Sequence, residues 1–294
     1  MVDILIRKRI LKIQERLGMR IGITYGVKAM PVVKNLSQAL EALRELYKIG
    51  LKAFVLPPEL FSGIESHSDL YKSKYGDLLK IKDEAKRYNI ELSLRLPQIS
   101  GEPDEMIRIY TKICSIMDVR AFSAKPNFYS AFMPHDQALR LAVYKINEIV
   151  ASEAPRVKIG IETTGKTGDV GSLEDVIDIV KRTNSTEPII NFGMLHAYDN
   201  GFLRTRRDFN FVFEKLRKSL GPAYFQNAFF FFSGVRYTSQ GYAETIPLAK
   251  ADIKLENMVR EAMAAGIKGT LIFEDPAKEK MVLGILDGLA DMVR

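Results

Sequence analysis

A chain of 294 residues, 47% hydrophobic and 27% charged, is long enough for one large α/β domain or two smaller ones and is ordinary in composition for a globular protein. Cys114 is the only cysteine and no apolar run approaches the roughly 20 residues of a membrane span. These features exclude an intrachain disulfide, argue against a membrane partner and are consistent with a reducing cytoplasm. The net charge of +7 favours an anionic partner, and the lack of tryptophan beside many Lys, Arg, Glu and Ile residues is typical of a thermophile.

The first 18 residues precede the regular pattern of the chain and predict a short amphipathic extension. They alternate charged and aliphatic residues without a continuous apolar core or a cleavage site, so they do not resemble a signal peptide. Ile4, Ile6, Ile10 and Ile13 fall on one side of a helix. We expect this helix to close the bottom of the domain that follows. A basic arm that contacts nucleic acid is the alternative.

Residues 19–294 alternate apolar runs of strand length with amphipathic stretches of helical period. The runs begin near Arg20, Leu51, Ile90, Val119, Val157, Pro188, Ala228 and Lys268. The clearest helical patterns cover 36–50, 172–183 and 255–266. Gly50 and Gly266 suit the position that follows a helix, and Ser172 with Asp175 resembles a capping box. Eight β-α units without a linker predict a single (β/α)8 TIM barrel in the α/β class, rather than an open doubly wound sheet.

The carboxyl ends of the eight predicted strands are where a barrel of this kind places its chemistry. Strand periodicity alone puts two carboxylates and two cations among the residues at these ends. The residues are Tyr25, Arg95, Lys125, Glu162, Asn191, Phe231 and Glu274.

Five segments carry motifs of a known kind: IGIETTGKTGDVGSLEDV at 159–176, FSGVRYTSQGYAETIPL at 232–248, LIFEDP at 271–276, NFGMLHAYDNG at 191–201 and LSLRLPQIS at 92–100. They resemble the endonuclease IV family of apurinic/apyrimidinic endonucleases, within the xylose isomerase-like barrels. The resemblance implies a TIM barrel and DNA cleavage beside an abasic site. It also implies a trinuclear zinc site held by histidine, aspartate and glutamate.

The zinc ligands of that family are mostly absent when its motifs are carried over position by position. Glu162 and Glu274 match two family glutamates. The other ligand positions that we matched hold Arg95, Lys125, Asn191, Met194, Phe231, Ala243 and Thr245. Two carboxylates are too few donors for a trinuclear site, so we expect no bound metal and no other cofactor. His196 follows Met194 by two residues, and we interpret it as a structural or surface residue rather than a substitute ligand.

The residues that stand at the family's zinc-ligand positions suggest two roles for the strand ends. In the first, Arg95 and Lys125 form two buried ion pairs with Glu162 and Glu274 and so offset the cost of burying carboxylates without a metal. In the second, Arg95 and Lys125 rebuild a site for a phosphate or an abasic nucleotide. Metal-free catalysis would use these four residues, with Lys125 as a base or an amine nucleophile if its pKa were lowered. Phe231 is expected to plug the vacated volume.

A second group of candidates lies on loops at the same end of the barrel. Arg204, Arg206 and Arg207 form a basic cluster, and Arg236 and Tyr237 follow the seventh strand. Such residues can position a phosphodiester backbone, although a solvated charged surface is an equal alternative.

The sequence therefore predicts a divergent endonuclease IV-like protein without zinc-dependent phosphodiesterase activity, and whether it is an enzyme stays open. The hypothesis we favour is binding of duplex DNA at abasic or damaged sites. One alternative is a sugar or sugar-phosphate isomerase or epimerase acting on an anionic small molecule. The other is a non-catalytic structural or interaction barrel whose mouth is closed by ion pairs and Phe231.

Overall fold

Eight parallel strands form a closed barrel in the computed structural model, which describes residues 2–293 except 29, 31, 65 and 154–156. The barrel strands are β1 (Met19–Thr24), β2 (Ala53–Leu56), β3 (Glu91–Arg95), β4 (Ala121–Ala124), β5 (Lys158–Glu162), β6 (Thr186–Asn191), β7 (Ala228–Thr238) and β9 (Gly269–Glu274). Consecutive strands pair in parallel, and the ring closes through β9, which pairs with both β7 and β1. The predicted (β/α)8 barrel is confirmed.

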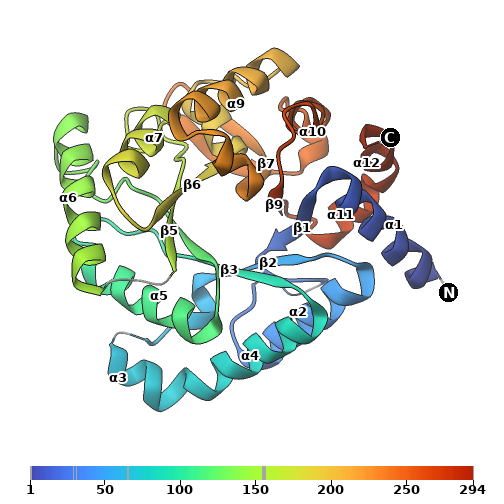
Figure 1. Ribbon diagram of the computed structural model, residues 1–294, viewed down its shortest axis with the longest axis horizontal. Helices are drawn as coiled ribbons and strands as arrows, with labels where there is room; N and C mark the ends of the chain where they lie inside the picture. Colours follow the sequence, from blue (N-terminus) through green and yellow to red (C-terminus); the bar gives the residue numbers. More distant parts are fainter. Residues whose placement is uncertain (1, 29, 31, 65, 154–156, 294) are drawn as a thin grey trace.

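Helices surround the barrel in an outer layer (Figure 1). They are α1 (Val2–Leu17), α2 (Leu36–Ile49), α3 (His67–Asp69), α4 (Tyr75–Tyr88), α5 (Asp104–Met117), α6 (His135–Glu153), α7 (Leu173–Arg182), α8 (Phe192–Tyr198), α9 (Arg206–Leu220), α10 (Leu255–Ala264), α11 (Glu279–Gly284) and α12 (Leu286–Met292). Short helical turns are η1 (Pro58–Phe61), η2 (Leu70–Lys74), η3 (Pro222–Gln226) and η4 (Leu248–Lys250). Among the described residues, no helix combines the length and apolarity that crossing a membrane requires.

The predicted helix boundaries are confirmed at three points by local chemistry. Gly50 ends α2 with φ +93°, a left-handed conformation that costs glycine little. Gly266 follows α10 with φ +67°. Ser172 and Asp175 form a reciprocal capping box at the start of α7.

Helix α1 packs in the outer layer against α2, β1 and α12. Ile10 and Ile13 are buried, whereas Ile4 is 58% exposed. Gln14 fixes the end of the helix, because its side chain donates to the Gly50 carbonyl at 2.8 Å and accepts from the Ile21 amide at 2.7 Å. The predicted apolar side is therefore buried only in the second half of the helix.

The run of four phenylalanines on β7 divides between two apolar layers. Phe229 and Phe231 lie inside the barrel with Ala53, Val55, Ile189 and Ile272. Phe230 and Phe232 lie on the other face, and Phe230 packs against Phe192 and Phe213 of the surrounding helices. This split follows the alternation of side chains along a strand.

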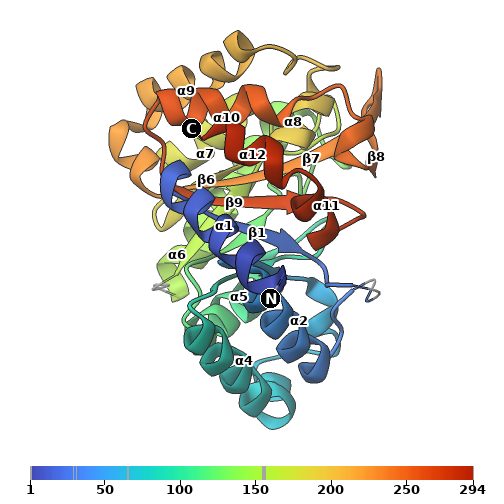
Figure 2. The same ribbon diagram turned by 90° about the vertical axis from the view of Figure 1, so that its right-hand side faces the viewer.

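The hairpin of β7 and β8 (Gly241–Ile246) is an element that sequence periodicity missed. The apolar run that begins near Ala228 predicts a short seventh strand, but the strand continues to Thr238, turns, and pairs antiparallel with β8. The hairpin projects past the end of the barrel in Figure 2. Its outer half is exposed and polar, so the apolar pattern that marks a barrel strand ends before the strand does.

Two phenylalanines on α9 allow a test of the helix-to-barrel packing. Phe213 is fully buried against Phe192, Phe225 and Phe230, whereas Phe211 on the same helix is 55% exposed. We expect Phe213→Ala to lower the free energy of unfolding by about 3–5 kcal/mol, because it removes contacts and leaves a cavity. Phe211→Ala should change it by less than about 1 kcal/mol. Equal losses in urea unfolding of the two variants would contradict this packing.

Candidate functional site

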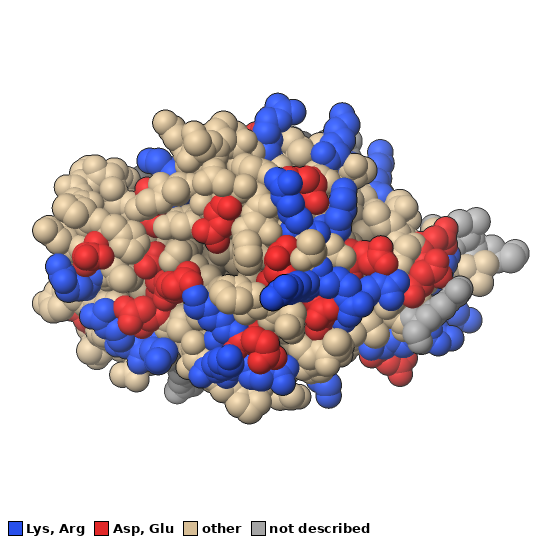
Figure 3. Space-filling view, turned by 90° about the horizontal axis from the view of Figure 1, so that it is seen from above, with Lys and Arg blue, Asp and Glu red and all other residues tan. Residues whose placement is uncertain are grey.

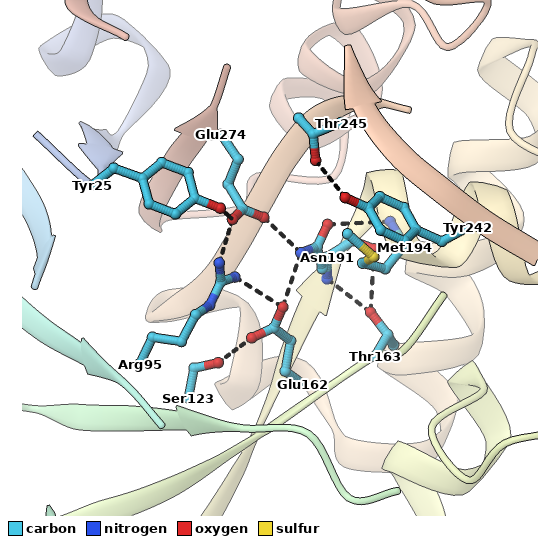
Figure 4. Close-up of polar contacts among 10 residues, drawn as sticks. All are labelled: Tyr25, Arg95, Ser123, Glu162, Thr163, Asn191, Met194, Tyr242, Thr245 and Glu274. Atoms are coloured by element: carbon cyan, nitrogen blue, oxygen red, sulfur yellow. Dashed lines mark hydrogen bonds and ion pairs between the residues drawn. The ribbon is translucent and has the colours of Figure 1, made fainter. Parts of the chain in front are cut away.

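Five of the seven predicted strand-end residues converge at the carboxyl end of the barrel. Tyr25, Arg95, Glu162, Asn191 and Glu274 follow or end five different strands, and their polar groups point toward one another (Figure 4). Because parallel strands of a barrel end on one face, residues distant in sequence form one cluster here. We call these five residues, together with Ser123 of β4, the central cluster.

Arg95 lies between the two glutamates and forms an ion pair with each. Its Nη2 is 3.0 Å from Glu162 Oε1, and its Nη1 contacts Glu274 Oε1. The side chain of Glu162 is fully buried, that of Glu274 is 3% exposed and that of Arg95 is 15% exposed. One guanidinium thus serves two buried carboxylates, and its planar set of donors is suited to that role.

Asn191, Ser123 and Tyr25 supply most of the remaining hydrogen bonds of the carboxylates. The Asn191 side-chain amide donates to Glu162 Oε1 at 2.9 Å and to Glu274 Oε2 at 2.8 Å. The Ser123 hydroxyl donates to Glu162 Oε2, and the Tyr25 hydroxyl donates to Glu274 Oε1 at 3.4 Å. All four carboxylate oxygens therefore have a partner, as buried charged groups require.

The charge state of the central cluster follows from these contacts. Burial alone would raise the pKa of Glu274, but the adjacent Arg95 charge and hydrogen bond, with smaller contributions from Lys125 and Asn191, hold that pKa below its usual range. Burial and the Glu274 charge raise the pKa of Tyr25, so its hydroxyl stays protonated. At neutral pH Glu274 is an acceptor and Tyr25 is a donor.

The donors present do not fit the zinc site that the family resemblance implies. Within the described ranges, no group of three or more His, Cys, Asp or Glu residues is placed to hold a metal ion. The only carboxylates in the central cluster already accept hydrogen bonds from Arg95, Asn191, Ser123 and Tyr25. A divalent cation would have to compete with a guanidinium for the same oxygens.

Lys125 follows β4 but takes no part in the ion pairs. The prediction that Lys125 supplies one of two buried bridges is wrong, because Arg95 makes both. In the part of the chain that the structure describes, the half-buried Lys125 ammonium has no ion pair or hydrogen bond. Its charge is still close enough to help lower the pKa of Glu274. Lys125 is therefore the one strand-end cation available to a ligand.

Phe231 fills the barrel below the guanidinium. The ring is fully buried, and the Arg95 Cζ lies 4.4 Å from its centroid, within the range of a cation–π interaction. The predicted plugging role agrees with this geometry.

The predicted basic cluster does not form a continuous cationic surface. Arg204 and Tyr237 both contact Asp252, the latter at 2.7 Å. Arg206 pairs with Glu261 of α10 at 2.5 Å, and Arg236 pairs with Glu244 of β8 at 2.5 Å. Arg207 is exposed, and no ion pair to it occurs among the described residues. Acidic side chains are likewise interspersed among the basic ones on the face shown in Figure 3.

His196 has the structural role predicted for it. Its ring is fully buried; Nδ1 accepts a hydrogen bond from the Leu203 amide at 3.0 Å, and Nε2 lies 2.9 Å from Asp252 Oδ1. Nε2 must therefore carry the proton of the neutral ring. Burial lowers the pKa of His196, although the adjacent Asp252 opposes this shift. Both ring nitrogens are in use, so neither is free to bind a metal or a proton.

The loops above the central cluster are tied to one another. Gln98 donates to Asn127 at 3.1 Å, and Asn127 donates to Asp169 at 3.0 Å, which joins the loops after β3, β4 and β5. The β7–β8 hairpin is joined to the loop after β5, because the Tyr242 amide donates to the Gly165 carbonyl at 2.7 Å. Sequence reasoning missed these links and also missed Ser123, whose only signal is a polar residue inside an apolar run.

No family model and no curated protein matches the sequence. The structure is similar to a D-tagatose 3-epimerase-like protein, with a TM-score of 0.65 and 18% identity over 94% of this chain and 98% of that one. It is equally similar to SacUVDE, with a TM-score of 0.65 and 15% identity over 93% and 99% of the two chains. A xylose isomerase domain protein from Planctomyces limnophilus gives a TM-score of 0.59 and 10% identity over 93% and 96%. At these identities the likeness establishes the fold alone, a (β/α)8 TIM barrel.

The two mouth cations, Arg95 and Lys125, should differ sharply in their effect on stability. We expect Arg95→Met to lower the free energy of unfolding by about 3–5 kcal/mol at neutral pH, since two buried carboxylates lose their counter-ion. Lys125→Met, which breaks no ion pair, should change it by less than about 1 kcal/mol. The exposed pair of Arg236 with Glu244 provides a second control, and Arg236→Met should also cost less than about 1 kcal/mol.

The loss of stability in Arg95→Met should also depend on pH in a defined way. The pKa of Glu274 is lowered by folding, so the stability it contributes is present above its unfolded pKa and is lost as pH falls through the folded pKa. The difference between wild type and Arg95→Met should therefore be largest near neutral pH and shrink in acid. A difference in urea unfolding that stays constant from neutral to acidic pH would contradict the ion-pair account.

Proposed function

We propose that this protein is a metal-independent, non-catalytic barrel that diverged from the endonuclease IV-like enzymes. The observation that carries the proposal is the position of Arg95, whose guanidinium lies between Glu162 and Glu274. It supplies from the protein itself the positive charge that two buried carboxylates require. With every carboxylate oxygen bonded, neither glutamate is free to activate water or to take a proton from a substrate.

Metal content and strand cleavage together test this proposal. Protein purified without chelator should carry far less than one zinc ion per chain, and it should not cleave a duplex containing an abasic-site analogue with either zinc or EDTA present. Zinc-dependent cleavage that disappears in Glu162→Gln would overturn the proposal. Glu244→Gln, at an exposed carboxylate of the hairpin, is the matched control for contaminating nuclease.

A second candidate function is recognition of DNA at abasic or damaged sites through the barrel mouth. The half-buried Lys125, which has no carboxylate partner among the described residues, favours it. Arg95, Arg204, Arg206, Arg207, Arg236 and Tyr237 would be its other contacts. Most of those cations are already paired with carboxylates, so we rank this function second. The sugar or sugar-phosphate epimerase alternative has the fold likeness in its favour, but it needs a free acid or base at the same glutamates.

Binding of a fluorescent duplex in EDTA distinguishes these candidates. Recognition at the mouth predicts that an abasic-site analogue binds more tightly than the intact duplex and that Lys125→Gln reduces this preference. Lys218→Gln, on the exposed surface of α9, should leave the preference unchanged. Equal and strongly salt-sensitive binding of both duplexes would assign the affinity to net charge alone. Thermal stabilisation by sugar phosphates but not by DNA would favour the epimerase alternative.

A further inference from the structure

Two exposed tyrosines lie together on the outer helical layer, at the start of α4. Tyr71 and Tyr75 are 49% and 40% exposed, and their ring centroids are 5.7 Å apart. Tyr71 belongs to the π-helical turn η2, a rare conformation that often marks functional sites. Lys112 of the neighbouring helix α5 places its ammonium 5.8 Å from the Tyr71 ring. The two rings are therefore held next to a cation with their surfaces open to solvent.

A groove runs between α4 and α5 beyond these tyrosines. Its volume is about 810 Å³, and its lining includes the cations Lys82, Lys86, Lys112 and Arg120. Its lining also includes apolar residues such as Leu92. The groove also contains an unused polar group, because the hydroxyl of Thr111 has no hydrogen-bond partner although that residue is only 5% exposed. The groove is thus partly polar, partly apolar and large enough for a ligand.

The carboxylates that line the groove are paired, and so are Lys86 and Arg120, which leaves Lys82 and Lys112 as its cations without a carboxylate partner among the described residues. Asp118 pairs with Lys86 at 3.0 Å, Glu153 pairs with Arg108 at 2.5 Å, and Glu91 lies 3.7 Å from Arg20. Within the described ranges, four lysines around the tyrosines and the groove have no carboxylate within ion-pair distance. They are Lys72, Lys74, Lys82 and Lys112.

The helical repeat aligns these groups in one direction. Tyr71, Tyr75, Lys82 and Lys86 recur four or seven residues apart, so they follow one side of η2 and α4. Fifteen residues of helix separate Tyr71 from Lys86, which corresponds to about 22 Å at 1.5 Å per residue. This length suits an extended chain better than a compact metabolite.

We propose that this surface, formed by η2, α4 and α5, binds a single-stranded nucleic acid. Unpaired bases would stack on Tyr71 and Tyr75. Phosphates would contact Lys82 and Lys112 along the groove, and Lys72 and Lys74 beside the tyrosines. Exposed aromatic rings combined with a cationic groove are the usual means by which proteins bind single strands without sequence preference. A lipid surface fits less well, because the exposed groups are tyrosine and lysine rather than aliphatic side chains.

This surface is separate from the barrel mouth. The groove is lined by Glu91, Val119 and Val157, which lie at the amino ends of β3, β4 and β5, whereas the central cluster lies at the carboxyl ends. The inference therefore goes beyond the proposed function and does not depend on it. A non-catalytic barrel of this kind would use its outer helical surface, and not its mouth, to contact a partner.

Fluorescence anisotropy with a short labelled oligothymidine in EDTA tests the proposal. The wild-type protein should bind the single strand more tightly than a duplex, in which the bases are already stacked. Tyr71→Ala combined with Tyr75→Ala should weaken binding at least about tenfold through loss of stacking. Lys72→Gln and Lys112→Gln should each reduce the slope of log affinity against log salt by about 0.7.

The controls place matched changes on other surfaces. Tyr144→Ala removes an exposed ring of α6, and Lys218→Gln removes an exposed lysine of α9; neither should change oligothymidine binding. The proposal fails if the single strand does not bind, if the duplex binds equally well, if the tyrosine variants bind as wild type, or if polyglutamate competes as effectively as the oligonucleotide. None of these results would bear on the zinc and cleavage measurements that test the mouth.

Discussion

The placement of one arginine between two buried glutamates is the constraint on which the rest of the barrel mouth depends. Arg95, Glu162 and Glu274 come from β3, β5 and β9, so their ion pairs join strands that are not neighbours in the sheet. The Arg95 guanidinium also packs on Phe231, and Asn191 bridges both carboxylates. Removing the guanidinium would leave two charges in a site from which water is largely excluded.

The fold could be predicted from the sequence because strand and helix periods are local properties. Alternation on β7 placed Phe231 inside the barrel, and the end of each strand placed Arg95, Glu162 and Glu274 on one face. The pairing within that face could not be predicted. Whether Arg95 or Lys125 pairs with the glutamates depends on the length and direction of each side chain, which strand periodicity does not determine. In the structure Arg95 forms an ion pair with both glutamates.

The outer surface was harder to anticipate than the mouth. The spacing of Tyr71 and Tyr75 does not by itself predict a binding surface. Lys112 and one side of the groove come from α5, which is distant in sequence. Likewise, the sequence predicts a basic region from Arg204, Arg206 and Arg236. In the structure each of them forms an ion pair with a carboxylate of another element. Charge in a sequence is therefore a poor guide to charge on a surface until tertiary pairing is known.

The shared use of one guanidinium also has a consequence for how this barrel can evolve. A change of Arg95 to histidine would add one metal ligand, but it would first remove the counter-ion of Glu162 and Glu274. The remaining ligands would have to arrive at Asn191 and at other strand ends before a metal could replace the lost charge. Every single step toward a metal centre therefore passes through a less stable protein, so the residues of the mouth are expected to change together or not at all.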